Sequence, residues 1–216
     1  MTHLHIPDAA IPGRIAVAGY ALMALALSIC LWTLRNSDAR RSTALTGIVG
    51  AFMLLAMSVP LGPVPVHLNL AALAGVLLGP AMALICVFSV NLILALAGHG
   101  GITVVGLNTI VLGVQAVTAG WLFSRLYGRF GGNGRGAGVY AGLSTMVSVL
   151  LSLAVVFGVV SAAAIGEGPL DAHGVERTVA LGGPIGLLGA VLESLVVAAI
   201  ATFLERVRPD LLLKQR

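Results

Sequence analysis

Histidines crowd the start of this chain, where His3 and His5 lie within the segment MTHLHIPDA. A free α-amine has an unperturbed pKa of about 7.7–8.0, so a metal ion can displace its proton near neutral pH. With a histidine at position two or three, the amine, the intervening amides and the imidazole close consecutive chelate rings, and planar nitrogen ligands suit Ni(II) or Cu(II). Met1-Thr2-His3 has this spacing, and Thr2 supplies the amine if Met1 is removed. The segment predicts a metal chelate, with a solvated tail as the alternative.

Three further histidines lie in segments that separate apolar runs. His67 ends VPLGPVPVH, a proline-stiffened segment that could hold an imidazole against the N-terminus. The alternative is an interfacial histidine bonded to loop carbonyls. His99 lies in the glycine-rich GHGGITVVGLNT and is expected to orient a ligand or simply to belong to a shaped loop. His173, in the charged loop predicted at 165–178, is expected to be solvated.

The elements that position these residues are predicted to be membrane-spanning helices. The chain has 216 residues, of which 58% are hydrophobic and 9% charged, and its mean hydropathy is +1.04. A bilayer-spanning helix needs about 20 mostly apolar residues, and the runs lack the alternation of a transmembrane barrel. We therefore expect an all-α polytopic membrane protein, residues 1–216 forming a single membrane domain. The expected helices are 15–34, 43–59, 68–79, 81–97, 105–126, 136–164 and 179–206.

Basic residues predict seven spans, with the N-terminus outside and the C-terminus cytoplasmic. The third helix is short, and 68–97 could instead be one helix kinked at Gly79-Pro80, which would leave six spans. Seven spans satisfy the positive-inside rule, because ten of the twelve basic residues then lie on the cytoplasmic side. Those ten are Arg35, Arg40, Arg41, Arg125, Arg129, Arg135, Arg206, Arg208, Lys214 and Arg216. The pI near 9.7 thus reflects topology and not nucleic-acid binding. This topology also places all five histidines outside.

The same topology divides the chain into three parts. Residues 1–14 are expected to be an extracytoplasmic metal-binding segment, 15–206 a helical bundle and 207–216 a cytoplasmic tail. Small residues predict close helix contacts. They are Ala71, Gly75 and Gly79 on the short third helix, and Gly106, Gly113 and Gly120 on the fifth.

Three polar residues fall inside predicted spans: Asn91, Gln115 and Glu193. A carboxylate within a span is a functional hypothesis by default. Glu193 could line an ion path, in which case the protein would be a secondary, proton-coupled metal transporter. The alternative is a hydrogen-bonded group that joins its helix to neighbouring helices.

Four segments resemble one family, the nickel/cobalt substrate-binding membrane component (CbiM/NikM type) of energy-coupling-factor transporters. They are HIPDA at His5–Ala9, VPVHLNLAALAGVLLGP, GHGGITVVGLNT and the C-terminal RVRPDLL. Ala9 stands where the family usually has glycine. The resemblance implies an ion held in a plane by the N-terminal amine, the amide and imidazole of a second-position histidine, and the histidine of the second segment.

The histidine of the second segment corresponds to His67. The second-position histidine does not correspond to a single residue of this chain. Three extra residues precede HIPD, so His5 matches by motif and His3 matches by distance from the amine. We predict His3 as the chelator, with His5 as a further ligand or a loop-fixing residue. Asp8 and Asn108, in the matched segments, are expected to orient ligands or shape loops.

The resemblance implies a substrate-capture subunit of an ATP-driven importer in a prokaryotic plasma (inner) membrane. Its cargo is expected to be Ni2+ or Co2+, nickel being favoured, without an organic cofactor. The chain has no glycine-rich phosphate loop and only one lysine, Lys214, so it is not expected to hydrolyse ATP. The implied partners are a transmembrane coupling (T) protein, two cytoplasmic ATPase subunits and often a small accessory membrane subunit. A membrane-embedded metalloenzyme built on His3, His5 and His67 is a further alternative, but no paired carboxylate or activated nucleophile supports it.

Overall fold

The computed structural model describes residues 11–35, 39–59, 67–98, 100–131, 136–165 and 172–213, and in these ranges the chain is helical without strands. The side chains of 39–42, 165, 172–175, 177, 178 and 213 are not described. The helices are α1 (Gly13–Leu34), α2 (Ala39–Ser58), α3 (Ala71–Leu78), α4 (Pro80–Leu96), the 3-10 turn η1 (Ile102–Val104), α5 (Val105–Phe130), α6 (Ala137–Ile165), α7 (Ala172–Val207) and α8 (Asp210–Leu213). The predicted all-α class is confirmed.

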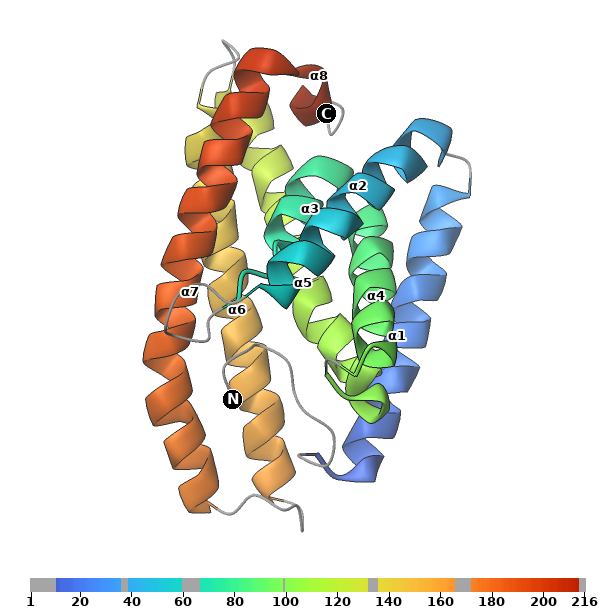
Figure 1. The fold of residues 1–216 in the computed structure, drawn as a ribbon, viewed down its shortest axis with the longest axis vertical. Helices are drawn as coiled ribbons and strands as arrows, with labels where there is room; N and C mark the ends of the chain where they lie inside the picture. The colour runs from blue at the N-terminus through green and yellow to red at the C-terminus, as the bar shows by residue number, and fades with distance from the viewer. Residues whose placement is uncertain are drawn as a thin grey trace.

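Helix α5 is the centre of the bundle. It packs against α1, α3, α4 and α6, while α6 pairs with α7 along their length (Figure 1). In the apolar segment of α5, 67% of the residues are buried, against 17% for α1. The outer helices therefore turn most of their apolar surface outward, and α5 supplies the surface on which the others assemble.

The outward-facing surface is that of a membrane protein. Large apolar side chains such as Trp32 on α1, Phe52 on α2 and Leu195 on α7 are more than half exposed. A soluble protein seldom exposes such extensive apolar surface. Among the described residues, α1, η1–α5, α6 and α7 are long and apolar enough to cross a bilayer, and Thr43–Ser58 and Pro80–Leu96 are shorter apolar helices. Helix α3 has eight residues, which span only about 12 Å at ~1.5 Å per residue, so it cannot cross alone.

Gly79 separates α3 from α4, so the alternative of one kinked helix over 68–97 is wrong. Its backbone has φ 78° and ψ 164°, which ends α3, and Pro80 starts α4 at the first helical position. Glycine reaches positive φ without a Cβ clash, and proline fits the first turn because its missing N–H has no helical partner there. The chain turns back here, which agrees with two separate helices, and the number of membrane spans stays a prediction.

The described helix ends that border the basic segments lie at one end of the bundle, as the seven-helix prediction requires. Figure 1 shows the end of α1 and the start of α2 at the same end of the bundle as α8. Glu205, near the end of α7, joins the end of α5 to the start of α6 at that end. Its carboxylate accepts hydrogen bonds from the Tyr127 hydroxyl (3.2 Å) and from the amides of Gly136 (3.2 Å) and Ala137 (3.1 Å). Which end faces the cytoplasm stays a prediction.

The predicted small-residue contacts are confirmed for Gly75, Gly106, Gly113 and Gly120, whereas Gly79 ends α3 instead of lying on it. A Cβ added to Gly75 of α3 would lie 2.0 Å from the carbonyl oxygen of Ala116, and one added to Gly120 of α5 would lie 2.5 Å from that of Gly75. The backbones of α3 and α5 therefore touch directly. Gly106 and Gly113 similarly meet the backbone of Tyr20 on α1 and the side chain of Leu84 on α4.

Several boundaries differ from those predicted; α2, for example, begins at Ala39 and not at 43. Helix α7 begins at Ala172 and not at 179, so the predicted loop at 165–178 is wrong over its second half. The polar sequence there indicated a loop, but a helix that extends beyond an apolar layer needs no apolar residues. Helix α5 continues to Phe130, and α8 was not predicted. The expected tail at 207–216 therefore contains a helical turn.

Candidate metal site

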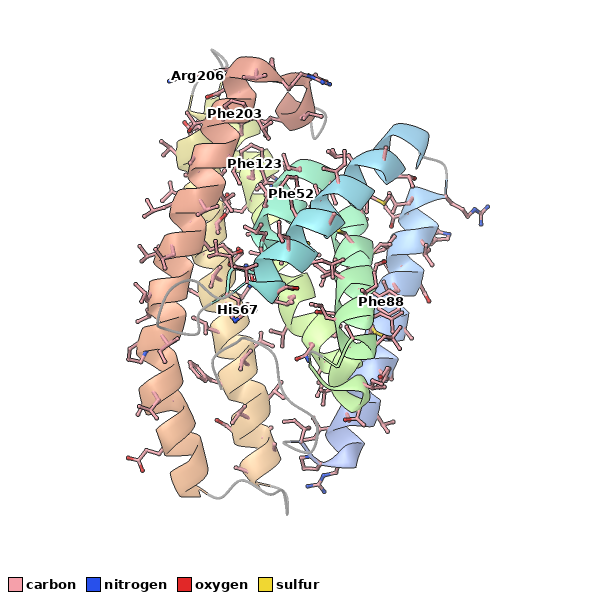
Figure 2. All side chains as sticks on the ribbon, in the orientation of Figure 1. Phe52, His67, Phe88, Phe123, Phe203 and Arg206 are labelled. Carbon is pink, nitrogen blue, oxygen red and sulfur yellow. The ribbon has the colours of Figure 1, made fainter. Side chains whose placement is uncertain are left out.

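The segment that precedes α3 holds the histidine singled out from the sequence. His67 is partly buried, and Asn69 and Leu70 after it are buried. Figure 2 shows His67 part-way along α6 and α7, well inside the two ends of the bundle. The sequence predicted an outer loop at this position. The structure instead recesses His67, because α3 is too short to lift its first residue to the end of the long helices.

The backbone directly before α3 is strained. Leu70 has φ 54° and ψ 18°, the left-handed region, and is the one non-glycine residue with positive φ in the part of the chain that the structure describes. An L-residue pays roughly 1–2 kcal/mol for this conformation. The Asn69 side chain spans the turn, since its Oδ1 accepts a hydrogen bond of 2.7 Å from the Ala71 amide. Asparagine commonly stabilises turns in this way.

Asn69 is the first member of a buried hydrogen-bond network that crosses the bundle. Its Nδ2 donates to Oε1 of Gln115 on α5 at 3.1 Å. Nε2 of Gln115 donates to Oε1 of Glu193 on α7 at 2.8 Å. The backbone amides of Asn69 and Ala72 also lie within reach of the Glu193 carboxyl group. The network thus ties α5 and α7 to both sides of the strained Leu70.

The depth of this network explains why its members are paired. Gln115 is fully buried, Glu193 is 3% exposed and Asn69 is 6% exposed. A buried polar group without a partner costs the full penalty of losing water. Glu193 therefore contacts donors from α3 and α5 at a point where water cannot replace them. This arrangement matches the helix-joining alternative in the sequence analysis.

The other predicted residues lie elsewhere on the described helices or outside the described residues. Asn91 of α4 donates to the Thr109 hydroxyl of α5 at 3.5 Å, so its hydrogen bond is not with Gln115 or Glu193. Asn108 is buried on the first turn of α5. The remaining candidates lie outside the described residues: Met1, Thr2, His3, His5, Asp8 and His99. The backbone of His173 is helical, but its side chain is not described. Among described residues, no group of three His, Cys, Asp or Glu side chains is placed to hold a metal.

Asn69 is the residue that the sequence analysis missed. It lies in VPVHLNLAAL, between the candidate ligand and a buried helix. An amide side chain at that point in an apolar run was a signal for a turn. Its partners lie 46 residues away for Gln115 and farther still for Glu193, so only the packed fold reveals them.

The fold and its exposed apolar surface define a polytopic helical membrane protein. Residues 5–211 match the family described as CbiM, cobalt uptake substrate-specific transmembrane region, and the chain belongs to this family. The resemblance found in the sequence is thereby confirmed. As a multi-pass membrane component of metal uptake, the chain fits the plasma-membrane localisation predicted for it.

Relatives and solved structures agree with this assignment. A protein of Haloquadratum walsbyi named for metal transport, HQ_3621A, is 28% identical over 98% of this chain and 94% of its own length. A protein of Archaeoglobus fulgidus named for fused nickel transport, NikMN, is 28% identical over 97% of this chain and 68% of its own length. Two solved structures share the fold. One is described as a transition metal transporter, with TM-score 0.77, 17% identity and coverage of 94% of this chain and 93% of that chain. The other is a truncated transition metal transporter, with TM-score 0.74, 18% identity and coverage of 95% and 98%.

Proposed function

We propose that this protein is the substrate-capture subunit of an ATP-driven importer and that it binds Ni2+ or Co2+ at His67. The observation that carries the proposal is the position of His67. It is partly buried inside the bundle and directly precedes a turn that hydrogen bonds from α5 and α7 hold in place. Neutral imidazole is the commonest protein ligand for transition metals. A ligand on a rigid turn is preorganised for binding.

The proposed ligand set combines His67 with the start of the chain. The N-terminal amine and His3 would form consecutive chelate rings, with His5 as a further ligand or a residue that fixes the segment. A planar set of nitrogen donors favours Ni(II), so nickel is the expected cargo in preference to cobalt. The nickel transport name of the Archaeoglobus fulgidus relative is consistent with this preference.

Energy for import is proposed to come from partner subunits. The sequence contains no phosphate-binding loop ending in Lys-Ser or Lys-Thr. The expected partners are the T protein, two ATPase subunits and a small accessory membrane subunit. Uptake in vesicles that contain these partners should require ATP. Uptake that survives ATP depletion but stops when the proton gradient collapses would instead support the proton-coupled alternative.

Binding of Ni2+ and Co2+ to the full chain, purified with its native amino terminus and a C-terminal tag, tests the ligand assignment. His67→Ala should lose high-affinity binding while the protein still inserts and purifies. His173→Ala is the matched control, because it removes an imidazole that was not assigned to the site. Undiminished binding by His67→Ala would refute the assignment.

The amino terminus is tested separately. A few residues added before Met1 leave every side chain intact but displace the amine, so binding should fall nearly as far as in His3→Ala. His5→Ala should be milder. An extended chain that keeps native nickel affinity would show that the amine is not a ligand, and His5 with His67 would then be the better pair. Mass spectrometry of the metal-loaded protein identifies both the first residue and the bound ion.

A further inference from the structure

We propose that Glu193, Gln115 and Asn69 are positioning residues for His67, and that they act as one hydrogen-bond chain whose direction is fixed. The proposal rests on the proposed role of His67 as a metal ligand. The residues come from three parts of the fold: the turn before α3, the middle of α5 and the middle of α7. None of the three is proposed to touch the metal.

The direction of the chain is set at its two ends. At one end the Ala71 amide can only donate, so the Asn69 side chain must present Oδ1 to it. Nδ2 of Asn69 then faces Gln115 and must meet its Oε1, which leaves Nε2 of Gln115 to donate to Glu193. A side-chain amide carries an acceptor on one branch and donors on the other. No amide in the chain can therefore flip without placing two donors or two acceptors against each other.

The far end of the chain requires an acceptor. The contacts of the Glu193 carboxylate are with the Gln115 side chain and with the backbone amides of Asn69 and Ala72, and all of these groups donate. A carboxylate offers about four lone-pair sites on two oxygens. Glutamine at this position has almost the same shape, but its NH2 group would face one of the donors. A side chain of the right shape is therefore not enough at position 193, because both of its terminal atoms must accept hydrogen bonds.

This chain acts on the turn that carries His67. Two of its contacts fall on the Asn69 backbone and side chain, and a third falls on Ala72, so they bracket Leu70 in its left-handed conformation. A strained residue persists only where its surroundings over-determine it. If these hydrogen bonds are broken, the turn can relax, and His67, two residues before Asn69, is then displaced. Metal ligands must be held within about 0.5 Å of their productive positions.

A swap of partners separates positioning from general stability. Glu193→Gln places a donor against donors, and Gln115→Glu places an acceptor against the Glu193 carboxylate. The double variant Gln115→Glu/Glu193→Gln restores every pairing, because the new amide on α7 can donate its NH2 group to the new carboxylate on α5 while its oxygen accepts from the backbone amides. Mutation of residues that orient metal ligands typically weakens metal binding 10–100-fold. We expect each single variant to lose about that much nickel affinity and the double variant to recover most of it.

Ser152→Ala is the matched control for a buried bond between helices. The Ser152 hydroxyl of α6 is fully buried and donates to the Val111 carbonyl of α5 at 2.9 Å, a hydrogen bond in which the Asn69, Gln115 and Glu193 side chains take no part. The experiment measures Ni2+ affinity by calorimetry and the thermal unfolding of the metal-free full chain in detergent. Ser152→Ala should lower the unfolding temperature and leave nickel affinity unchanged.

The outcomes distinguish the two proposals. If His67→Ala binds nickel like the wild type, the proposed function fails. If His67→Ala loses binding but Glu193→Gln keeps wild-type affinity, only the positioning role is refuted. A double variant that binds no better than Glu193→Gln, or a Ser152→Ala variant that loses as much affinity, also refutes it. If Gln115→Glu does not accumulate, comparison of Glu193→Gln with the double variant still decides the question.

Discussion

Replacing Gly75 by alanine tests the contact on which the position of α3 depends. The added Cβ would lie 2.0 Å from the Ala116 carbonyl oxygen, whereas real Cβ atoms essentially never come closer than 3.0 Å to a neighbour. To restore that minimum distance between the new Cβ and the carbonyl oxygen, α3 and α5 must separate locally by about 1 Å. Over-packing usually costs about 1–3 kcal/mol. The upper end applies here, because a backbone oxygen cannot rotate away.

Helix propensity offsets part of this cost, since alanine is favoured over glycine by about 1 kcal/mol in a helix interior. We therefore expect Gly75→Ala to lower the free energy of unfolding by a net amount of about 2 kcal/mol. The measurement is unfolding of the purified protein by SDS titration in mild detergent. Gly158→Ala in α6 is the control, because a Cβ there meets nothing within 4 Å, and it should be neutral or stabilising. If Gly75→Ala is as stable as Gly158→Ala, the close backbone contact between α3 and α5 is wrong.

The strained turn, the Glu205 contacts, the orientation and the metal ligands can each be tested in turn. Leu70→Gly should be more stable than Leu70→Ala by about 1 kcal/mol, measured by the same titration, because glycine adopts left-handed backbone without strain; the reverse order would contradict the strained turn. Glu205→Ala should destabilise the protein by about 1–3 kcal/mol by removing the acceptor of three hydrogen bonds, and Glu205→Gln should cost less; equal stability of all three proteins would show that water replaces the carboxylate. A reporter fused after Arg216 should be active only if it folds in the cytoplasm, and activity on the outer side would overturn the predicted orientation. Nickel affinity should fall as pH is lowered from about 8 to about 6, because protons compete with the metal for imidazole and amine nitrogens; a flat calorimetric profile would exclude these ligands.

Local pattern was enough to predict most of the helices. Apolar runs located the bundle, and Gly79-Pro80 marked the break between α3 and α4. The start of α7 could not be found in this way, because residues 172–178 contain no apolar run and a helix outside the apolar layer carries no hydropathy signal. The approach of Gly75 to Ala116 was indicated by small residues, but the partner backbone was not.

The site was predicted less completely than the fold. His67 stood out because histidine is a common ligand and its segment resembles a known motif. Glu193 and Gln115 stood out only as polar residues within apolar runs, and nothing local connected them. Their link runs through Asn69, whose side chain meets α5 only after α3 has packed on α5. Contacts between residues so far apart in sequence depend on the register of three helices, which one sequence does not specify.

The short length of α3 explains why the recessed histidine and the buried network occur together. Non-helical backbone inside a membrane is tolerated only where protein satisfies its polar groups. The first amides of any helix lack partners within that helix, and α3 begins among the buried residues Asn69, Leu70 and Ala71. Asn69 accepts a hydrogen bond from the amide of Ala71, and the Glu193 carboxyl group lies within reach of the amide of Ala72. The groups that make a helix start possible at this depth therefore also fix the segment that carries His67. An apolar residue in place of Glu193 would leave donors unpaired and would also release the turn. For this reason the near-isosteric variant Glu193→Gln, combined with its rescue by Gln115→Glu, tests the site more sharply than replacement of Glu193 by an apolar residue.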